Sequence, residues 1–110
     1  MAQDKIVFVY ITFPNSEEAQ KVGRILLEKR LCGCVNLFTN INSMYWWEGK
    51  IEVSQEAVLI VKTRESLYPE VEKEVLKNHS YSCPCIAKIE VSEVTPCFYR
   101  WLLQETGVEI

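Results

Sequence analysis

The sequence has little of what most enzymes and nucleic-acid-binding proteins depend on. It contains one histidine and four glycines in 110 residues, and it lacks a Gly-rich phosphate loop and any Gly-x-Gly-x-x-Gly motif. Its net charge is -3, whereas a protein that neutralises the phosphates of a nucleic acid needs a basic surface. We therefore expect no nucleic-acid partner. Because no Ser/His/Asp pattern is visible either, the sequence predicts that the protein is not an enzyme.

Long apolar runs are also missing. The N-terminal segment MAQDKIVFVY has an acidic residue before a run of only six apolar residues, which is too short and wrongly flanked for a signal peptide or a membrane span. We therefore expect a cytoplasmic protein that does not bind membranes. The five cysteines would allow two disulfides and one thiol, but five reduced thiols are typical of a cytosolic protein.

What the sequence does contain is an unusually long β-hairpin. Residues 34–63 alternate like two strands that turn at Glu48-Gly49, and no Gly or Pro interrupts residues 50–63. At about 3.3 Å per residue the second arm can reach roughly 45 Å, whereas a domain of this length has a radius of gyration of about 13 Å. Part of the hairpin should therefore project beyond its own core and contact another protein chain, which predicts an oligomer.

The two arms of the hairpin differ in how they alternate. The first arm carries Val35, Leu37, Ile41 and Tyr45 on one alternation and Asn36, Asn40 and Asn42 on the other. The second arm is apolar on one alternation and becomes apolar on both at Val58 and Ile60. This pattern predicts a half-buried first arm and a second arm that ends in the centre of the sheet.

The other elements follow from apolar periodicity and capping residues. We expect a strand over 6–11, a helix over 16–31 that stops at Gly33, a helix over 66–78 capped by Ser66, a strand over 86–91 and a helix that starts at Pro96 and ends near Gly107. In the last strand, Ala87, Ile89 and Val91 should face inward, with Lys88 and Glu90 outward.

This order, βαββαβ with an extra C-terminal helix, predicts one α+β domain over residues 1–110 with a ferredoxin-like fold. The first and third strands should lie in the middle of the sheet, which agrees with their apolar residues on both alternations. Two helices can cover only one face of such a sheet. The other face needs a second cover, and another subunit's sheet is the simplest one.

With this topology in place, the chain resembles the CutA-type divalent-cation tolerance proteins. The residues that carry the resemblance are Cys34-Val35-Asn36, the segment 45–51 (YWWEGKI), Lys62-Thr63, His79, Tyr81 and Pro84. The resemblance implies a tight homotrimer of ferredoxin-like subunits, related in architecture to the PII-type signalling proteins. It also implies a role in tolerance to copper and other divalent cations, with no securely assigned reaction.

One segment departs from the family pattern. Where the family reads like His-Pro-Tyr-Glu-Val-Pro-Glu-Ile, this chain has His79 to Ile86 as HSYSCPCI, which loses two carboxylates and gains two thiols. The candidate metal ligands are therefore Cys34, His79, Cys83 and Cys85, which would suit Cu(I) or Zn(II). The alternatives are that the thiols only pack, that Cys83 and Cys85 point to opposite sides, and that His79 hydrogen-bonds the end of the second helix.

A second candidate site is an inter-subunit cleft for a small anion. Its candidate residues are Trp47, Glu48, Lys50, Lys62, Tyr81 and Glu90. Trp46 and Trp47 should point to opposite faces of the hairpin, and the alternative is that these rings anchor subunit contacts. The leading hypothesis is thus a trimeric, cytoplasmic, copper-binding or divalent-cation-binding protein. The alternative is a PII-like small-ligand sensor or interaction scaffold without a metal-binding role.

Overall fold

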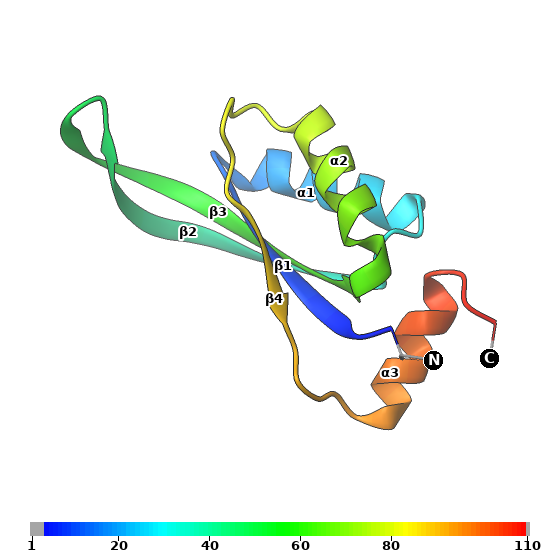
Figure 1. The fold of residues 1–110 in the computed structure, drawn as a ribbon. Helices are drawn as coiled ribbons and strands as arrows, with labels where there is room; N and C mark the ends of the chain where they lie inside the picture. Colours follow the sequence, from blue (N-terminus) through cyan, green and yellow to red (C-terminus); the bar gives the residue numbers. More distant parts are fainter. Residues whose placement is uncertain (1–3, 110) are drawn as a thin grey trace.

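A four-stranded antiparallel sheet with the order β2-β3-β1-β4 organises the computed structural model, which describes residues 4–109 (Figure 1). The elements are β1 (Ile6–Phe13), α1 (Ser16–Glu28), β2 (Cys34–Trp47), β3 (Lys50–Arg64), a 3-10 turn (Glu65–Leu67), α2 (Tyr68–Asn78), β4 (Ile86–Glu90) and α3 (Pro96–Glu105). The predicted α+β, ferredoxin-like order with a C-terminal helix is confirmed. Residues 1–3 and 110 of the expected 1–110 domain lie outside the described residues.

Strands β1 and β3 lie in the middle of the sheet, as their apolar residues on both alternations predicted. Helices α1 and α2 pack on one face, which we call the helix-covered face (Figure 1). Its core is built on side chains such as Val9 and Ile11 of β1, Leu59 and Val61 of β3, and Leu26 of α1, all with no exposed surface. Burial of aliphatic side chains of this size contributes roughly 1.5–3 kcal/mol each.

The opposite face of the sheet, which we call the open face, is covered only at one end. There α3 packs Leu102 and Leu103 against Ile6 at the start of β1, with Phe8 half-buried beside them. Elsewhere on this face large apolar side chains remain exposed; Ile89 of β4, which pairs with Phe8, is 49% exposed. One chain therefore leaves an apolar sheet surface without a cover.

The prediction for β4 was wrong. Ala87 and Ile89 pair with Tyr10 and Phe8 of β1, so they lie on the open face, while Ile86 packs against the core under α1 and α2. Alternation separates the residues of a strand into two sets, but it does not say which set meets the helices. In an edge strand with mixed residues, that choice is made by the register with β1.

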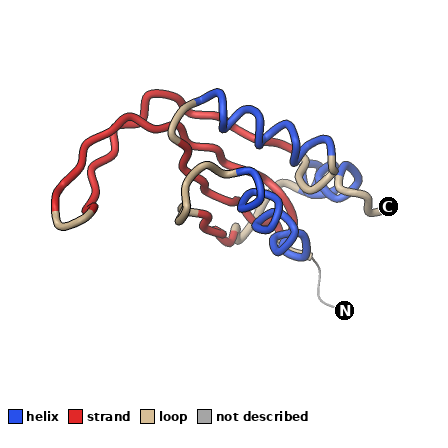
Figure 2. The backbone as a smooth tube through the Cα atoms, turned by 90° about the horizontal axis from the view of Figure 1, so that it is seen from above, coloured by secondary structure: helices blue, strands red, loops and turns tan. Residues whose placement is uncertain are grey.

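The hairpin of β2 and β3 projects far from the rest of the chain (Figure 2). The molecule measures 50 × 26 × 22 Å with a radius of gyration of 14.9 Å, above the roughly 13 Å of a compact domain of this size. Glu48 and Gly49 form the predicted turn, with φ of 50° and 79°, the positive values that a two-residue hairpin turn requires. Trp46 and Trp47 fall on opposite faces, as predicted, because they occupy successive positions of one strand.

A β-bulge changes which side chains of the first arm share a face. Phe38 pairs with Val58 and Ile41 pairs with Glu56, so two residues of β2 oppose one of β3, and Asn40 adopts a φ of 58°. The inserted residue shifts the alternation by one. Ile41 and Tyr45 therefore lie on the open face, and the prediction that they share a face with Val35 was wrong beyond the bulge.

The helix boundaries also differ from the prediction. Helix α1 ends at Glu28 because Arg30 takes the left-handed conformation, with a φ of 59°, and the Leu31 amide donates to the Leu26 carbonyl over 3.0 Å. Gly33 instead makes room for α3, since a Cβ there would lie 2.3 Å from a methyl carbon of Leu102. Within residues 4–109, we find no helix with the length and apolar character needed to cross a membrane.

The N-terminus of α2 is arranged differently from the expected cap. Ser66 belongs to the 3-10 turn, and its hydroxyl contacts Asp4 rather than capping the helix. Arg64 donates to Asp4 over 3.0 Å and to the Thr106 carbonyl over 3.0 Å. Burial alone would raise the pKa of Asp4, but the hydrogen bonds from Ser66 and Arg64 outweigh it and lower that pKa. This network ties the start of β1 and the end of α3 to β3.

Substitution of Asn40 by Val should destabilise the hairpin. A β-branched residue at a positive φ costs about 1–2 kcal/mol, and relief of that strain would remove the bulge and turn Tyr45 away from the open face. The free energy of unfolding from urea titration should fall by that amount. The matched control is Asn42→Val, two residues further along the same exposed strand, which should cost much less. Equal effects in the two variants would contradict the role given to the bulge.

Candidate functional site

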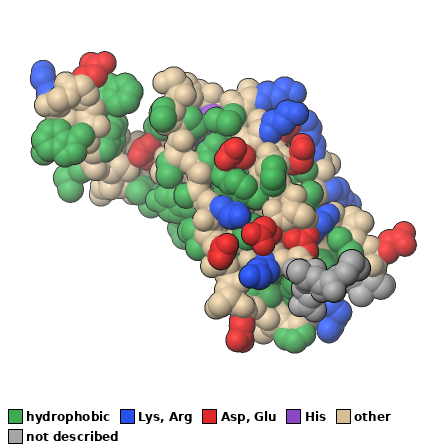
Figure 3. Space-filling view, viewed as in Figure 1, with side chains coloured by type: hydrophobic (Ala, Val, Ile, Leu, Met, Phe, Trp, Pro, Cys, Tyr) green, Lys and Arg blue, Asp and Glu red, His purple; other side chains and the backbone are tan. Residues whose placement is uncertain are grey.

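A groove opens between the projecting part of the hairpin and the loop that leads into β4 (residues 80–85). In the space-filling view the end of the hairpin stands apart from the main body (Figure 3). The groove is lined by aromatic side chains, by two carboxylates and by three sulfur-containing residues. They are Tyr10, Tyr45, Trp47 and Tyr81; Glu52 and Glu56; and Met44, Cys83 and Cys85. The bulge in β2 decides this lining, because it puts Tyr45 and Trp47 on the open face with Glu52 and Glu56.

His79 anchors the loop on one side of the groove. Its side chain has no exposed surface and stacks on Phe13, with 4.5 Å between the ring centroids. Its Nε2 lies 2.7 Å from the Thr12 carbonyl oxygen, and its Nδ1 accepts a hydrogen bond from the Tyr81 amide over 3.0 Å. These contacts fit the neutral ring with its proton on Nε2. The predicted alternative, a bond to the end of the second helix, was wrong, since His79 binds the end of β1.

Two further contacts hold the same loop. The Ser80 amide donates to Glu18 Oε2 of α1 over 3.1 Å, and the Tyr81 hydroxyl donates to Glu56 Oε2 of β3 over 2.8 Å. Burial, followed by the hydrogen bond to Glu56, raises the pKa of Tyr81 well above its usual range. Tyr81 therefore remains a hydrogen-bond donor at neutral pH. The loop is fastened to a strand end, a helix and the hairpin at once.

The charged side chains that line the groove have one sign. Glu52 and Glu56 line it, and no Lys or Arg does among residues 4–109. Charges of one sign around a recess raise the local concentration of ions of the opposite sign. The groove therefore favours cations over anions.

One chain does not bring the six candidate cleft residues together. Trp47 and Tyr81 line the groove, and Glu48 and Lys50 lie at the hairpin turn next to it. Lys62 lies at the other end of β3, where it pairs with Cys34 and its Nζ sits 5.2 Å from the Phe8 ring centroid. Glu90 pairs with Val7 on the helix-covered face. A cleft that used all six would need a second chain.

The four candidate metal ligands are also distributed. Cys83 and Cys85 are exposed and border the groove, whereas Cys34 is at the far end of the sheet. Both nitrogens of His79 already have partners. The part of the chain that the structure describes holds no group of three or more His, Cys, Asp or Glu residues arranged to bind a metal.

The cysteine pairs behave differently from each other. Cys32 is 2% exposed and packs in the core, and burial raises the pKa of its thiol to about 12. Cys83 and Cys85 border the same groove. Because both residues line this one groove, the expectation that they point to opposite sides was wrong.

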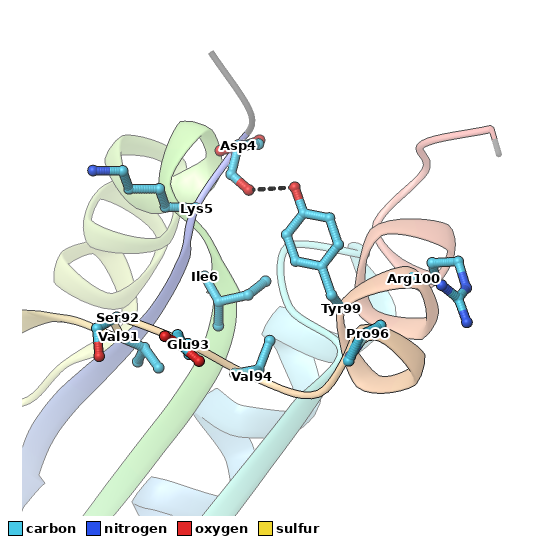
Figure 4. Close-up of a pocket in the computed structure, with 10 residues that line it drawn as sticks. All are labelled: Asp4, Lys5, Ile6, Val91, Ser92, Glu93, Val94, Pro96, Tyr99 and Arg100. Atoms are coloured by element: carbon cyan, nitrogen blue, oxygen red, sulfur yellow. Dashed lines mark hydrogen bonds between the residues drawn. The ribbon is translucent and has the colours of Figure 1, made fainter.

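A second hollow lies where α3, the start of β1 and the segment 91–94 meet (Figure 4). The Tyr99 hydroxyl donates to the Asp4 carbonyl over 2.7 Å at its edge, and the Asp4 carboxylate is held by Arg64 and Ser66. Its charged groups are of both signs, and within residues 4–109 neither Cys nor His lines it. These contacts are structural, so the groove is the better candidate site.

Comparison with known proteins assigns the chain to a family. The family model described as "CutA1 divalent ion tolerance protein" matches residues 7–105. The chain belongs to the CutA1 family. The divalent-cation tolerance protein CutA of Archaeoglobus fulgidus is 47% identical over 95 residues, covering 86% of this chain and 92% of that protein. The CutA of Pyrococcus horikoshii is 43% identical over 101 residues, covering 92% of this chain and 98% of that protein.

Solved CutA structures share the fold over nearly their whole length. The CutA1 crystal structure from Ehrlichia chaffeensis has a TM-score of 0.92 at 32% identity, covering 97% of this chain and 100% of that one. The structure from Archaeoglobus fulgidus has a TM-score of 0.89 at 44% identity, covering 92% and 98%, and is described as periplasmic. The cytoplasmic location expected here remains a prediction.

Several residues that line the groove of this CutA1-family chain were missed from the sequence. Tyr10, Tyr45, Glu52 and Glu56 lie on the open face beside the loop. Glu52 and Glu56 lie on the polar alternation of the second arm, and nothing in the sequence showed that the loop after α2 would close over that face. The signal that the sequence does offer is Asn40, because Asn tolerates a positive φ and such a residue inside an alternating strand can mark a bulge.

Substitution of His79 by Phe should loosen the loop without emptying the space beside Phe13. The Thr12 carbonyl and the Tyr81 amide would both lose their partner, and leaving such groups unsatisfied costs about 1–3 kcal/mol. Hydrogen exchange at the Tyr81 amide should become faster, and the free energy of unfolding should fall. Ser82→Ala, in the exposed part of the same loop, is the matched control and should change neither. Unchanged protection of the Tyr81 amide in the Phe variant would refute the anchoring role.

Proposed function

We propose that this protein functions in divalent-cation tolerance as a homotrimer that binds a metal ion and does not catalyse a reaction. The observation that supports this most directly is the groove, which has carboxylate and sulfur donors and no basic side chain among residues 4–109. Such donors suit cations, copper included. Family membership supports the tolerance role, since relatives carry that name.

Self-association is supported by the uncovered parts of the chain. Ile51 and Val53 near the hairpin turn are 62% and 68% exposed, and Phe38 and Ile89 on the open face are 47% and 49% exposed. Large apolar patches of this kind mark protein interfaces. The strand order also leaves β2 and β4 as edges, whose unpaired backbone groups favour pairing with another chain. A closed ring of three subunits would cover both features.

The second candidate function, a small-ligand sensor of the PII type, would be favoured by an anion site. The groove has no Lys or Arg side chain within the described residues, and Lys62 lies far from it. The aromatic side chains of the groove could still contact an organic ligand. Charge therefore ranks the metal ion above a small anion as the ligand of this site.

The proposal that the protein does not catalyse a reaction rests on what its candidate catalytic groups do in the structure. The only histidine has both ring nitrogens in structural hydrogen bonds, so it is not free to act as a general base. Among residues 4–109, the exposed thiols of Cys83 and Cys85 are therefore not paired with a histidine base.

Light scattering tests the assembly. The wild-type protein should have three times the chain mass of 12.8 kDa. Ile89→Lys places a charge on the open face and should lower the mass, because burial of an unpaired charge at an interface is unfavourable. Leu76→Lys is the matched control, since Leu76 on α2 is exposed to a similar extent, 52% against 49%. A monomer mass for the wild type, or equal behaviour of the two variants, would contradict the trimer.

Calorimetric titration tests the ligand class. The reduced wild-type protein should bind Cu(I) or Zn(II) with a dissociation constant tighter than about 1 mM, an affinity of at least about 4 kcal/mol. Thermal-shift measurements with nucleotides and small organic anions should show no stabilisation. Stabilisation by one of these anions, without metal binding, would favour the sensor instead.

A further inference from the structure

We propose that His79 makes the groove sensitive to acid, because uptake of one proton transfers the ring Nδ1 from the Tyr81 amide to the Glu18 carboxylate. The exchange of partners releases the backbone of the loop over residues 80–85 and changes the shape of the groove. The contacts that carry this inference all lie within one chain. The inference concerns the movement of the loop, so it does not depend on which ligand the groove binds.

The partners of the His79 ring determine where its proton sits at neutral pH. A carbonyl oxygen only accepts, so Nε2, which lies 2.7 Å from the Thr12 oxygen, carries the proton. A backbone amide only donates, so Nδ1, which lies 3.0 Å from the Tyr81 nitrogen, carries none. An imidazolium ring has an N–H group on both nitrogens. On gaining a proton, the ring can therefore keep its contact with Thr12 but not its contact with the Tyr81 amide.

The Glu18 carboxylate of α1 lies beside the same ring nitrogen. Its Oε2 is 3.6 Å from Nδ1 of His79 and accepts a hydrogen bond from the Ser80 amide over 3.1 Å. A protonated Nδ1 is a charged donor, and charge-assisted hydrogen bonds to carboxylates are shorter and stronger than neutral ones. A small movement of Glu18 would complete such a bond. The Tyr81 amide, which would then face a second donor, has to leave.

Charged groups of both signs surround the ring. Glu18 on α1 favours the imidazolium, and so does the C-terminal end of α2, because His79 is the residue that caps this helix. Lys77 in the last turn of α2 opposes the charge but is exposed to solvent. Burial of the ring also opposes it, since the side chain has no exposed surface. From β1 the ring meets a carbonyl oxygen that accepts in either state and a neutral aromatic ring.

The loss of the amide contact reaches the groove through the loop. Residues 80–83 and Cys85 line the groove. The Tyr81 hydroxyl donates to Glu56 Oε2 of β3 over 2.8 Å, and protonation of the ring leaves this contact in place because the ring takes no part in it. The backbone at Tyr81 is therefore released while its side chain stays tied to the hairpin. Acid should reshape the groove rather than unfold the loop.

The experiment is a pH titration by NMR on the full-length protein. His79 is the only histidine among the 110 residues, so labelling of histidine with 15N gives one pair of ring-nitrogen signals. Histidine is also the side chain whose ordinary titration falls between pH 5 and 8. From pH 8 to pH 5, Nδ1 should gain a proton, and the backbone amide signals of Tyr81, Ser82 and Cys83 should shift with the same midpoint. The hydrogen-exchange protection factor of the Tyr81 amide should fall at least about fivefold.

Three variants test the parts of the device. Glu18→Gln keeps an acceptor oxygen for the Ser80 amide but removes the negative charge, so the midpoint of the ring titration should move to lower pH. The matched control is Glu17→Gln, an exposed neighbour on α1 with the same change in net charge, which should leave the midpoint in place. In His79→Phe the Tyr81 amide should be weakly protected at both ends of the pH range, with the pH dependence lost.

Several results would overturn the inference. Protonation of the ring without a change at the Tyr81 amide would refute the exchange of partners, and so would a ring that stays neutral down to pH 5. Equal midpoints for Glu18→Gln and the wild type would refute the role of Glu18. A pH-dependent Tyr81 amide in the Phe variant would assign the change to another group. If that variant does not fold, the wild type and the two Gln variants still decide. None of these results bears on metal binding, which the calorimetric titration tests separately.

Discussion

The pairing of β2 with β3 is the constraint on which the rest of the structure depends. Its inner part, as far as the bulge, lies beside β1, which pairs with residues 57–64 of β3, but its outer part has no core beneath it and is held by its own cross-strand pairs. An isolated two-stranded ribbon is only marginally stable in water. The proposed trimer would cover the exposed apolar side chains Ile51 and Val53 on this part. The length of the hairpin, the exposed sheet edges and the uncovered open face all support that proposal.

The bulge at Asn40 connects this ladder to the candidate site. Without the extra residue, Tyr45 would lie on the other side of the hairpin from Tyr81. With it, aromatic and acidic side chains of the hairpin face the loop that His79 fastens to β1. The site is therefore produced by two local departures from regular structure, one in a strand and one after a helix. The first is a feature of the backbone, whereas the second is held in place by the side chains of His79 and Tyr81.

Much of the fold could be predicted because it depends on periodicity and turn residues. The two central strands, the Glu48-Gly49 turn and the Pro96 helix start all follow from short-range rules. The errors concern residues whose placement depends on distant contacts. Arg30 takes the left-handed position at the end of α1, and Gly33 is needed instead where α3 approaches. Ile89 lies on the open face because of its register with β1. Part of the groove lining was missed because neither of its sides follows from local sequence. One side depends on the bulge in β2. The other is a loop that His79 fastens to Thr12, which lies 67 residues earlier in the chain.

The loop that ends at β4 has two parts with different surroundings. The first part is anchored by His79, whose ring nitrogens are both used in structural contacts. The second part carries Cys83 and Cys85, which are exposed in the single chain. A histidine buried in this way is lost as a ligand, so any metal chemistry passes to the sulfur atoms downstream. Under the proposed function, a cation in the groove would therefore meet carboxylate and sulfur donors rather than an imidazole, and the sulfur atoms would favour a softer ion than carboxylates alone.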